Sequence, residues 1–297
     1  MELKIKILIF LILMTAALIL LLLMITLGFG IKDESSNNSY KNGIVTNIWL
    51  QDNSKLDIIR KNRIRYLFVD VGDINKTGKT GNEEEIMEFL RFIKDYESKN
   101  SYYFALIAYT EINTYNYDLN EEFIQNYIED SKKLVSLGFD GILVDIEPVR
   151  FGLREKYLAL LRELKERLPE NSLLSAYAGT ISNDKNNEWE WEHDFYRKVS
   201  DRVDIVSMQG YDTDIKNKED YKNFIKSQVK EICKRQWNSL FLLGVPTHKQ
   251  EPETIENALE AFGEEIKKCP SNKFLGVNIF AEWTTDKNEW KIFKKYF

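Results

Sequence analysis

The stretch LGFDGILVDIEP at residues 137–148 joins a helix end to a short strand that carries two carboxylates. Gly138 follows an amphipathic run, at the position where glycine commonly ends a helix. Side chains alternate along a strand, so Leu143, Asp145 and Glu147 share one face. The other face is apolar and carries Ile142, Val144 and Ile146. This pattern predicts a strand that packs against helices on one side and presents its acids to an enclosed space on the other.

The alternation of short apolar runs and longer amphipathic runs continues on both sides of this stretch. Strands are predicted at residues 43–49, 64–71, 102–110, 141–146, 172–178, 203–208, 240–245 and 274–280. Helices are predicted at residues 56–62, 83–96, 120–137, 153–168, 191–199, 219–237, 252–268 and 288–296, with Pro252 in a first helical turn. Eight strands alternating with helices favour an α/β fold, a (β/α)8 TIM barrel over residues 43–297. An open doubly wound sheet is the alternative, but residues 49–52 lack its usual Gly-rich loop.

In a barrel of this kind, chemistry takes place at the carboxyl ends of the strands. Asp145 and Glu147 are therefore expected inside the mouth of the barrel, one above the other. Two carboxylates this close in a partly desolvated space cannot both ionise freely, so at least one pKa should rise into the range of a general acid. The alternative is structural, because acids at a strand end can also cap loops or pair with lysines.

Residues 140–147 resemble the D-G-x-D-x-D-x-E signature of glycoside hydrolase family 18, the chitinase-like enzymes, which are (β/α)8 barrels. Weaker similarities follow in the family's order at residues 66–70, 209–212, 243–246 and 276–283. Together they extend the resemblance over about residues 43–297.

The resemblance implies a role for each matching residue. Glu147 would protonate the glycosidic oxygen. Asp145 would orient the 2-acetamido group of the substrate, whose carbonyl oxygen attacks the anomeric carbon in place of an enzyme nucleophile. Tyr211 would donate a hydrogen bond to that carbonyl, Asp212 would help to hold the sugar, and Trp283 would form an apolar floor beneath the ring.

One position departs from the family signature. Leu143 stands where the signature has its middle aspartate. A leucine cannot share a proton with Asp145, so this departure predicts either slower acid–base catalysis or a barrel that binds sugars without cutting them. The sixth-strand similarity also has Gln209 where the family has methionine.

Further residues are expected at the mouth. Additional substrate contacts are predicted from Asp140, Asp70, Glu282 and Gln209, and Asp73 and Glu111 also follow strands. If the substrate lacked an acetamido group, Glu282 or Asp212 would be the second carboxylate of an ordinary glycosidase pair.

Two tryptophans flank Glu190 in the region after the fifth strand. Their spacing would put Trp189 and Trp191 on one side of an extended segment. We expect this pair to pack a loop onto the core, and stacking on sugars is the alternative. His248 is expected to be a surface residue near the rim.

The sequence of the N-terminal region predicts a membrane anchor. Residues 7–31 carry no charge and are long enough to span about 30 Å of hydrocarbon as a helix. A cleaved signal peptide is the alternative, but its apolar region is usually only about 7 to 15 residues and ends in small residues. Lys4 and Lys6 favour a cytoplasmic stub at residues 1–6. We therefore expect a transmembrane helix at 7–31, a polar linker at 32–42, and a single-pass cell-membrane protein with its catalytic domain extracellular.

Composition argues against several other classes of function. The net charge is −6, and an acidic chain repels phosphate backbones, so a nucleic-acid partner is not expected. Two histidines and two cysteines are too few for a zinc cluster, and we expect no metal, no cofactor and a monomer. Cys233 and Cys269 are expected to be buried free thiols, with a disulfide between them left open.

Three functions are compatible with the sequence. The leading hypothesis is a membrane-anchored glycoside hydrolase that cleaves β-linked N-acetylglucosamine-containing glycans, such as peptidoglycan or another wall polysaccharide. The second is a glycan-binding or wall-tethering protein without catalytic activity. The third is a glycosidase with an ordinary carboxylate pair that acts on a sugar lacking the acetamido group.

Overall fold

The computed structural model describes residues 40–72, 74, 77–78, 80, 83–182, 186–248, 251–269 and 273–297. The stub, the anchor and residues 32–39 of the linker, all predicted from the sequence, lie outside this part of the chain. A search restricted to the described residues found no helix that is both long and apolar enough to cross a bilayer. The compact unit that contains the predicted barrel begins at Tyr40.

Eight parallel strands of the described chain close into a barrel, which confirms the predicted fold. They are β1 (Gly43–Asn47), β2 (Tyr66–Asp70), β3 (Ala105–Asn113), β4 (Gly141–Glu147), β5 (Leu173–Ala178), β8 (Ile205–Met208), β9 (Leu240–Pro246) and β10 (Phe274–Phe280). The strand order around the barrel is β1-β10-β9-β8-β5-β4-β3-β2. Because all strands run in one direction, their carboxyl ends gather at one mouth.

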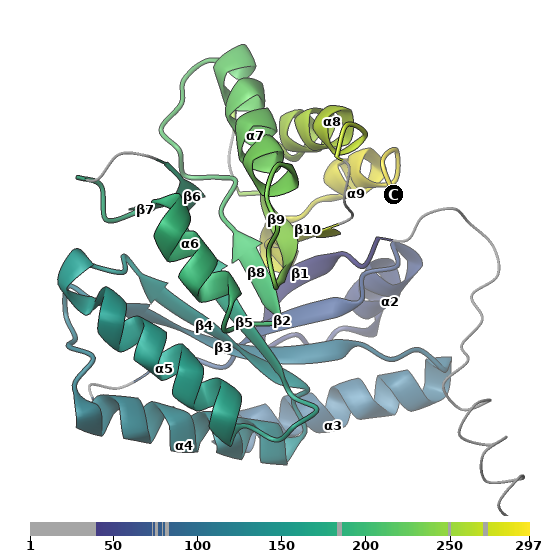
Figure 1. The fold of residues 1–297 in the computed structure, drawn as a ribbon. Coiled ribbons are helices and arrows are strands. Elements are labelled where there is room, and N and C mark those ends of the chain that lie inside the picture. The colour runs from purple at the N-terminus through teal and green to yellow at the C-terminus, as the bar shows by residue number, and fades with distance from the viewer. Residues whose placement is uncertain are drawn as a thin grey trace, which may run out of the picture. The chain divides into compact units, whose positions relative to one another are not determined.

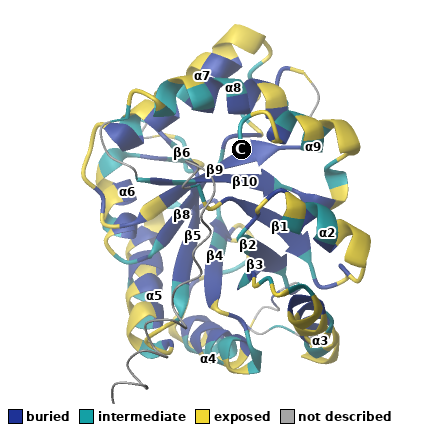
Figure 2. Cartoon of the chain, turned by 90° about the vertical axis from the view of Figure 1, so that its right-hand side faces the viewer, coloured by how far each residue is buried: buried dark blue, intermediate teal, exposed yellow. Residues whose placement is uncertain are grey.

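Helices surround the strands, and their exposed faces point outward (Figure 2). They are α2 (Asn53–Lys61), α3 (Glu83–Asn100), α4 (Glu121–Leu137), α5 (Arg154–Arg167), α6 (His193–Ser200), α7 (Lys218–Cys233), α8 (Ile255–Ile266) and α9 (Lys287–Phe293). Figure 1 shows this alternation of strand and helix along the chain. The sequence pattern did not predict the short 3-10 helices η1 (Phe151–Leu153) and η2 (Glu282–Thr284), nor the pairing of β6 (Thr180–Ile181) with β7 (Glu190–Trp191).

Local sequence signals set several helix ends. Gly138 caps α4 with a φ of 128°, a conformation that favours glycine. Thr254 caps α8, so Pro252 precedes this helix and does not lie in its first turn as predicted. The hydroxyl of Thr254 accepts a hydrogen bond from the N–H of Asn257, one of the backbone donors that lack a partner within the first turn of the helix. This cap explains why α8 begins only after Thr254.

The barrel has two hydrophobic layers. One lies between strands and helices, and the other fills the inside of the barrel with inward side chains such as Phe68, Ile107, Leu143 and Leu242. Gly141 allows β4 and β5 to approach, because a Cβ atom there would lie 2.2 Å from the carbonyl oxygen of Leu173. The interior is thus a packed core, and only its mouth is open to a ligand.

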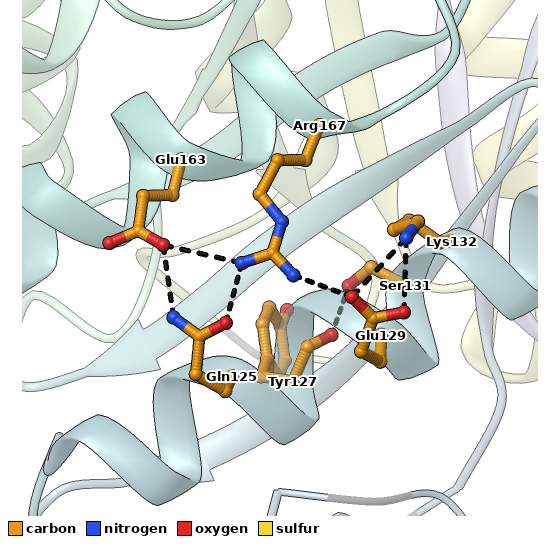
Figure 3. A network of polar contacts seen from close by, with 7 residues as sticks. All are labelled: Gln125, Tyr127, Glu129, Ser131, Lys132, Glu163 and Arg167. Atoms are coloured by element: carbon orange, nitrogen blue, oxygen red, sulfur yellow. Dashed lines mark hydrogen bonds and ion pairs between the residues drawn. The ribbon is translucent and has the colours of Figure 1, made fainter.

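Polar contacts join neighbouring helices on the outside of the barrel. Arg167 at the end of α5 donates to Gln125 at 2.6 Å and to Glu129 at 2.5 Å, both on α4. Figure 3 shows this network, which consists of Gln125, Tyr127, Glu129, Ser131, Lys132, Glu163 and Arg167. Its ion pairs are partly exposed to solvent, so each contributes only about 1 kcal/mol or less.

The two cysteines form a disulfide, so the prediction of free thiols is wrong. Cys233 ends α7, and Cys269 follows α8, the neighbouring helix. Their Cα atoms lie 5.2 Å apart, within the range that a disulfide requires. Sequence could not show this proximity, because it depends on how α7 and α8 pack side by side.

Candidate active site

A cavity of about 200 Å³ opens at the carboxyl ends of the barrel strands. Its lining is mainly polar and combines four carboxylates, three phenols and two amides. These residues are Glu111, Asp145, Glu147, Asp212, Tyr109, Tyr177, Tyr211, Gln209 and Asn278, with Val45, Leu143 and Phe280 as apolar neighbours. The cavity therefore brings together five residues that the sequence singled out for catalysis or substrate binding, and Glu111, which was also expected at the mouth, lines it as well. The five are Glu147, Asp145, Tyr211, Asp212 and Gln209.

Strand β4 supplies the central acids, as its alternation predicts. Leu143, Asp145 and Glu147 all line the cavity, and Leu143 is 2% exposed in the layer beneath Asp145. In the parallel register, Glu111 of β3 lies beside Asp145. Three carboxylates from two adjacent strands thus face the same small volume.

The surroundings of these acids favour their protonated forms. Burial among protein atoms raises the pKa of Glu147 from 4.5 to about 8, and the negative charges of Glu111 and Asp212 add to this effect. Burial, followed by repulsion from Glu147 and Glu111, raises the pKa of Asp145 well above its usual value. At neutral pH Glu147 therefore carries a proton that it can donate.

One oxygen of Asp145 has no hydrogen-bond partner within the described residues. Its Oδ1 atom is sealed from bulk solvent although the residue borders the cavity. A buried acceptor without a donor costs about 1 to 3 kcal/mol. A ligand that brings an N–H or O–H into the cavity supplies the missing donor once the carboxylate of Asp145 turns this oxygen toward the cavity.

Tyr211 is held by contacts on two sides. The hydroxyl of Tyr177 donates to the hydroxyl of Tyr211, which leaves the Tyr211 O–H available as a donor. Phe280 stacks against the Tyr211 ring, with ring centroids 5.0 Å apart. Burial raises the pKa of Tyr211 well above 10, so the phenol keeps its proton.

The loop that follows Tyr211 is fixed by a residue that sequence reasoning missed. The buried carboxylate of Glu253 accepts hydrogen bonds from the backbone N–H of Asp212 at 2.7 Å and of Thr213 at 2.9 Å. The hydroxyl of Thr213 donates to it as well, at 2.7 Å. Asp212 adopts a left-handed backbone with a φ of 57°, and its Oδ1 lies 3.7 Å from Nε2 of His248. Glu253 thereby positions Asp212 at the edge of the cavity.

Three of the predicted substrate contacts that carry a carboxylate lie outside the cavity lining. Asp140 precedes β4 at the opposite end of the barrel and accepts a hydrogen bond from the Leu106 N–H, so it links β3 to β4. The carboxylate of Asp70 accepts the N–H of Gly72 in the turn after β2. Glu282 is 8% exposed and pairs with Lys55 at 2.7 Å, and for this reason it does not supply a second carboxylate to the cavity. Asp73 falls outside the described residues.

The tryptophans that the sequence singled out, Trp283, Trp189 and Trp191, do not line the cavity. Trp283 is 46% exposed and lies at the rim in η2, while Phe280 forms the apolar wall of the cavity. Trp191 is 2% exposed and packs against Tyr157, whereas Trp189 is 47% exposed. The two indoles therefore do not share one environment, because β7 starts only at Glu190 and Trp189 lies in the preceding turn.

Strand alternation could have revealed other lining residues. Tyr109 lies two positions before Glu111, and Tyr177 and Asn278 lie near the ends of their strands. Counting inward positions from the end of each strand would have proposed all three. By contrast, no local signal identifies Glu253, because its partners are about forty residues away along the chain.

No family model and no curated protein sequence matches the chain. Solved structures do. A class V chitininase from Pseudomonas fluorescens matches with a TM-score of 0.62 and 15% identity, over 86% of this chain and 98% of that one. The spore cortex-lytic enzyme SleL of Bacillus megaterium matches with a TM-score of 0.59 and 15% identity, over 88% of this chain and 75% of that one.

The fold is that of the chitinase-like barrels. A tamarind chitinase-like lectin shares it as well, with a TM-score of 0.55 and 13% identity, over 87% of this chain and 99% of that one. Since enzymes and a lectin share the barrel, the function must be judged from the side chains at the mouth.

Proposed function

We propose that this chain is a glycoside hydrolase that cleaves β-linked N-acetylglucosamine-containing glycans by substrate-assisted catalysis with retention of configuration. The observation that carries the proposal is the pairing of a protonated Glu147 with Asp145, whose Oδ1 lacks a donor within the described residues. A 2-acetamido group offers the missing N–H. A sugar with only hydroxyl groups could donate an O–H, but it would lack the carbonyl nucleophile.

Each residue then has a defined step. Glu147 donates its proton to the glycosidic oxygen as the bond to the anomeric carbon breaks. The acetamido carbonyl oxygen attacks that carbon, while Asp145 accepts the amide N–H and Tyr211 donates to the carbonyl oxygen. The ionised Glu147 next removes a proton from water, and the water oxygen attacks the anomeric carbon as the bond from this carbon to the acetamido oxygen breaks. The enzyme is thereby returned to its starting protonation state.

Two features support an external location. The disulfide between Cys233 and Cys269 is typical of proteins in oxidising compartments. The uncharged run at residues 7–31 fits a membrane anchor. We therefore propose a single-pass cell-membrane protein whose barrel acts on a wall polysaccharide such as peptidoglycan, and the similarity to a spore cortex-lytic enzyme is in keeping with this substrate class.

The test is a comparison of the full-length chain with Glu147→Gln. Release of reducing ends from N-acetylglucosamine oligomers and from peptidoglycan is measured for both. The variant should lose at least a hundredfold in rate, because glutamine cannot donate the proton. Glu170→Gln, in an exposed turn, is the matched control. Equal turnover by wild type and Glu147→Gln would disprove the assignment.

Leu143 supports a second candidate, a glycan-binding protein without hydrolytic activity. Leu143 is buried beneath Asp145, and its apolar side chain offers no carboxylate that could share a proton with Asp145. This reading requires that the wild type binds oligomers without cutting them and that Leu143→Asp gains no activity.

An ordinary carboxylate pair is the third candidate, with Asp212 in the cavity as the second acid. An acetamido-mimicking thiazoline inhibitor separates this candidate from the first, because only a substrate-assisted site should bind that compound tightly.

A further inference from the structure

Basic residues gather at the amino end of the barrel, opposite the mouth. The segments that lead into β1, β2, β9 and β10 (residues 40–42, 62–65, 234–239 and 267–273), together with residues 294–297 after α9, contain ten lysines and arginines and no aspartate or glutamate. These four strands are consecutive in the closed barrel order, so the cations share one side of this end, and most of them are exposed. We call this surface the basic face; its residues are Lys41, Arg63, Arg65, Lys234, Arg235, Lys267, Lys268, Lys273, Lys294 and Lys295.

Carboxylates of the flanking helices cancel only part of this charge. Glu231, Glu256 and Glu265 pair with four of the ten cations. Lys273 donates instead to the carbonyl oxygen of Trp237, which is a neutral group. The basic face therefore keeps a net positive charge on a chain whose total charge is −6, while four carboxylates line the cavity at the other end of the barrel.

The N-terminal region joins the barrel beside the basic face. The ring of Tyr40 contacts the rings of Phe297 and Phe262, with centroids 5.4 and 6.2 Å apart. The uncharged run that forms the proposed anchor ends at Ile31, nine residues before Tyr40. Nine residues span at most about 30 Å. The proposed anchor therefore keeps this end of the barrel within about 30 Å of the bilayer surface.

An aromatic cavity adjoins the point where the chain enters the barrel. Its volume is about 300 Å³, and it lies between α8 and the residues that follow α9. Lys267 and Lys295 of the basic face border it, while Glu260 and Glu264 in its wall pair with lysines of α7. Four rings line it, from Tyr40, Phe262, Tyr296 and Phe297. Aromatic rings beside lysines are typical of surfaces that bind at the boundary between water and lipid.

We propose that the basic face binds the anionic lipid headgroups of the membrane in which the chain is anchored, so that the mouth points away from the bilayer. This inference rests on the anchor of the proposed function and adds an orientation to it. Each lysine or arginine close to an anionic surface strengthens the attraction about fivefold. The same headgroups would repel the carboxylates of the cavity, so the opposite orientation is disfavoured.

The orientation has a consequence for the substrate. The strands separate the mouth from the basic face, so a docked barrel presents Glu147 to polymer that lies beyond the membrane surface. The barrel then acts on wall polysaccharide at a set height above the bilayer. A barrel that merely hung on its linker would present the mouth in all directions.

The test places a short-range fluorescence probe at either end of one strand. Tyr103 precedes β3 and Tyr115 follows it, and their exposed fractions are similar, at 60% and 58%. Because β3 has nine residues at about 3.3 Å each, the two probes lie roughly 30 Å apart. Tyr103→Cys and Tyr115→Cys are each labelled in the full-length chain, whose own cysteines are paired, and reconstituted in vesicles that contain nitroxide lipids as quenchers. One set of vesicles is made of phosphatidylcholine alone, and the other contains phosphatidylglycerol as well.

The two probes should respond differently to lipid charge. The probe at Tyr103→Cys should be quenched strongly in the anionic vesicles and weakly in phosphatidylcholine, and added salt should reduce the quenching because it screens the charges. The probe at Tyr115→Cys should be quenched weakly in both sets of vesicles.

Charge removal tests the basic face directly. The triple variant Lys41→Gln, Lys267→Gln and Lys294→Gln should weaken docking by about a hundredfold, which brings quenching of the Tyr103→Cys probe down to its value in phosphatidylcholine. The matched control removes the same net charge at the mouth end, where α7 and α9 begin. It combines Lys216→Gln, Lys218→Gln and Lys287→Gln, and it should leave the quenching unchanged.

Quenching and vesicle flotation together separate the possible failures. Equal quenching of the two probes, or equal quenching of the Tyr103→Cys probe in both sets of vesicles, would overturn the docking while the anchor stands. A chain that floats with neither set of vesicles would overturn both. A response of the Tyr103→Cys probe to soluble polyphosphate, with equal quenching in both sets of vesicles, would assign the basic face to a soluble anionic polymer instead. None of these results depends on hydrolysis, so the proposed activity is judged separately by Glu147→Gln.

Discussion

Replacement of Glu147 by glutamine tests the protonation state on which the proposed mechanism depends. The substitution keeps the size and polarity of the side chain and removes its ionisation. In the wild type, the pKa of Glu147 is raised from 4.5 to about 8, chiefly because the surrounding protein desolvates the charge. The folded protein therefore holds a proton that the unfolded chain releases at neutral pH.

The magnitude follows from linkage between proton binding and folding. Between pH 4.5 and pH 8 the folded state binds one more proton than the unfolded state, so the free energy of unfolding falls as pH rises. The loss is about 1.4 kcal/mol per pH unit, which sums to an upper limit of about 5 kcal/mol over this interval. The stabilising contribution is complete below pH 4.5 and absent above about pH 8.

Urea unfolding of the wild type and of Glu147→Gln at a series of pH values from 4.5 to 9 measures this effect. The variant should gain several kcal/mol relative to the wild type as pH rises, while Glu170→Gln should follow the wild type throughout. The raised pKa of Asp145 makes the free energy of unfolding fall with pH in both proteins. Its contribution therefore cancels in the difference between them, except for the part that arises from repulsion by Glu147. Parallel curves for wild type and Glu147→Gln would refute the raised pKa and with it the role of Glu147 as acid at neutral pH.

Three further substitutions test separate parts of the structure. Glu111→Gln removes a negative charge beside Asp145 and should move the basic limb of the pH profile of kcat/KM to lower pH by about half a unit to one unit; an unshifted limb would show that Glu111 does not act on Glu147. Glu253→Gln places an amide N–H₂ against backbone donors of the Asp212 loop and should cost about 1 to 3 kcal/mol of stability in urea unfolding, with Glu256→Gln on the surface as control. The double replacement of Cys233 and Cys269 by serine opens a loop whose ends are 36 residues apart and should cost about 3 to 4 kcal/mol, which thermal unfolding with and without reductant would measure. No change on reduction would mean that the disulfide is absent from the purified chain.

Most of the barrel could be predicted from the sequence because its signals are local. Each of the eight barrel strands was recognised from a short apolar run and each α-helix from its amphipathic period, and their bounds differ from the structure by only a few residues. The positions of Asp145 and Glu147 also followed from alternation along one strand. The error at Pro252 arose because a proline suits a first helical turn. In the structure the side chain of Thr254 caps the helix by accepting the N–H of Asn257, so α8 begins after Thr254 and Pro252 lies before it.

The sequence by itself determined the fold class, the strand that carries the acids, and which of its faces is polar. Those properties depend on repeats of two and 3.6 residues, which are visible within ten or fifteen positions. Only the tertiary structure decided that Tyr177 supports Tyr211, that Glu253 holds the loop at Asp212, that Cys233 meets Cys269, and that Trp189 is exposed while Trp191 is buried. Contacts between residues 34 to 41 positions apart form when the barrel closes and neighbouring βα units pack together, and no local pattern records them.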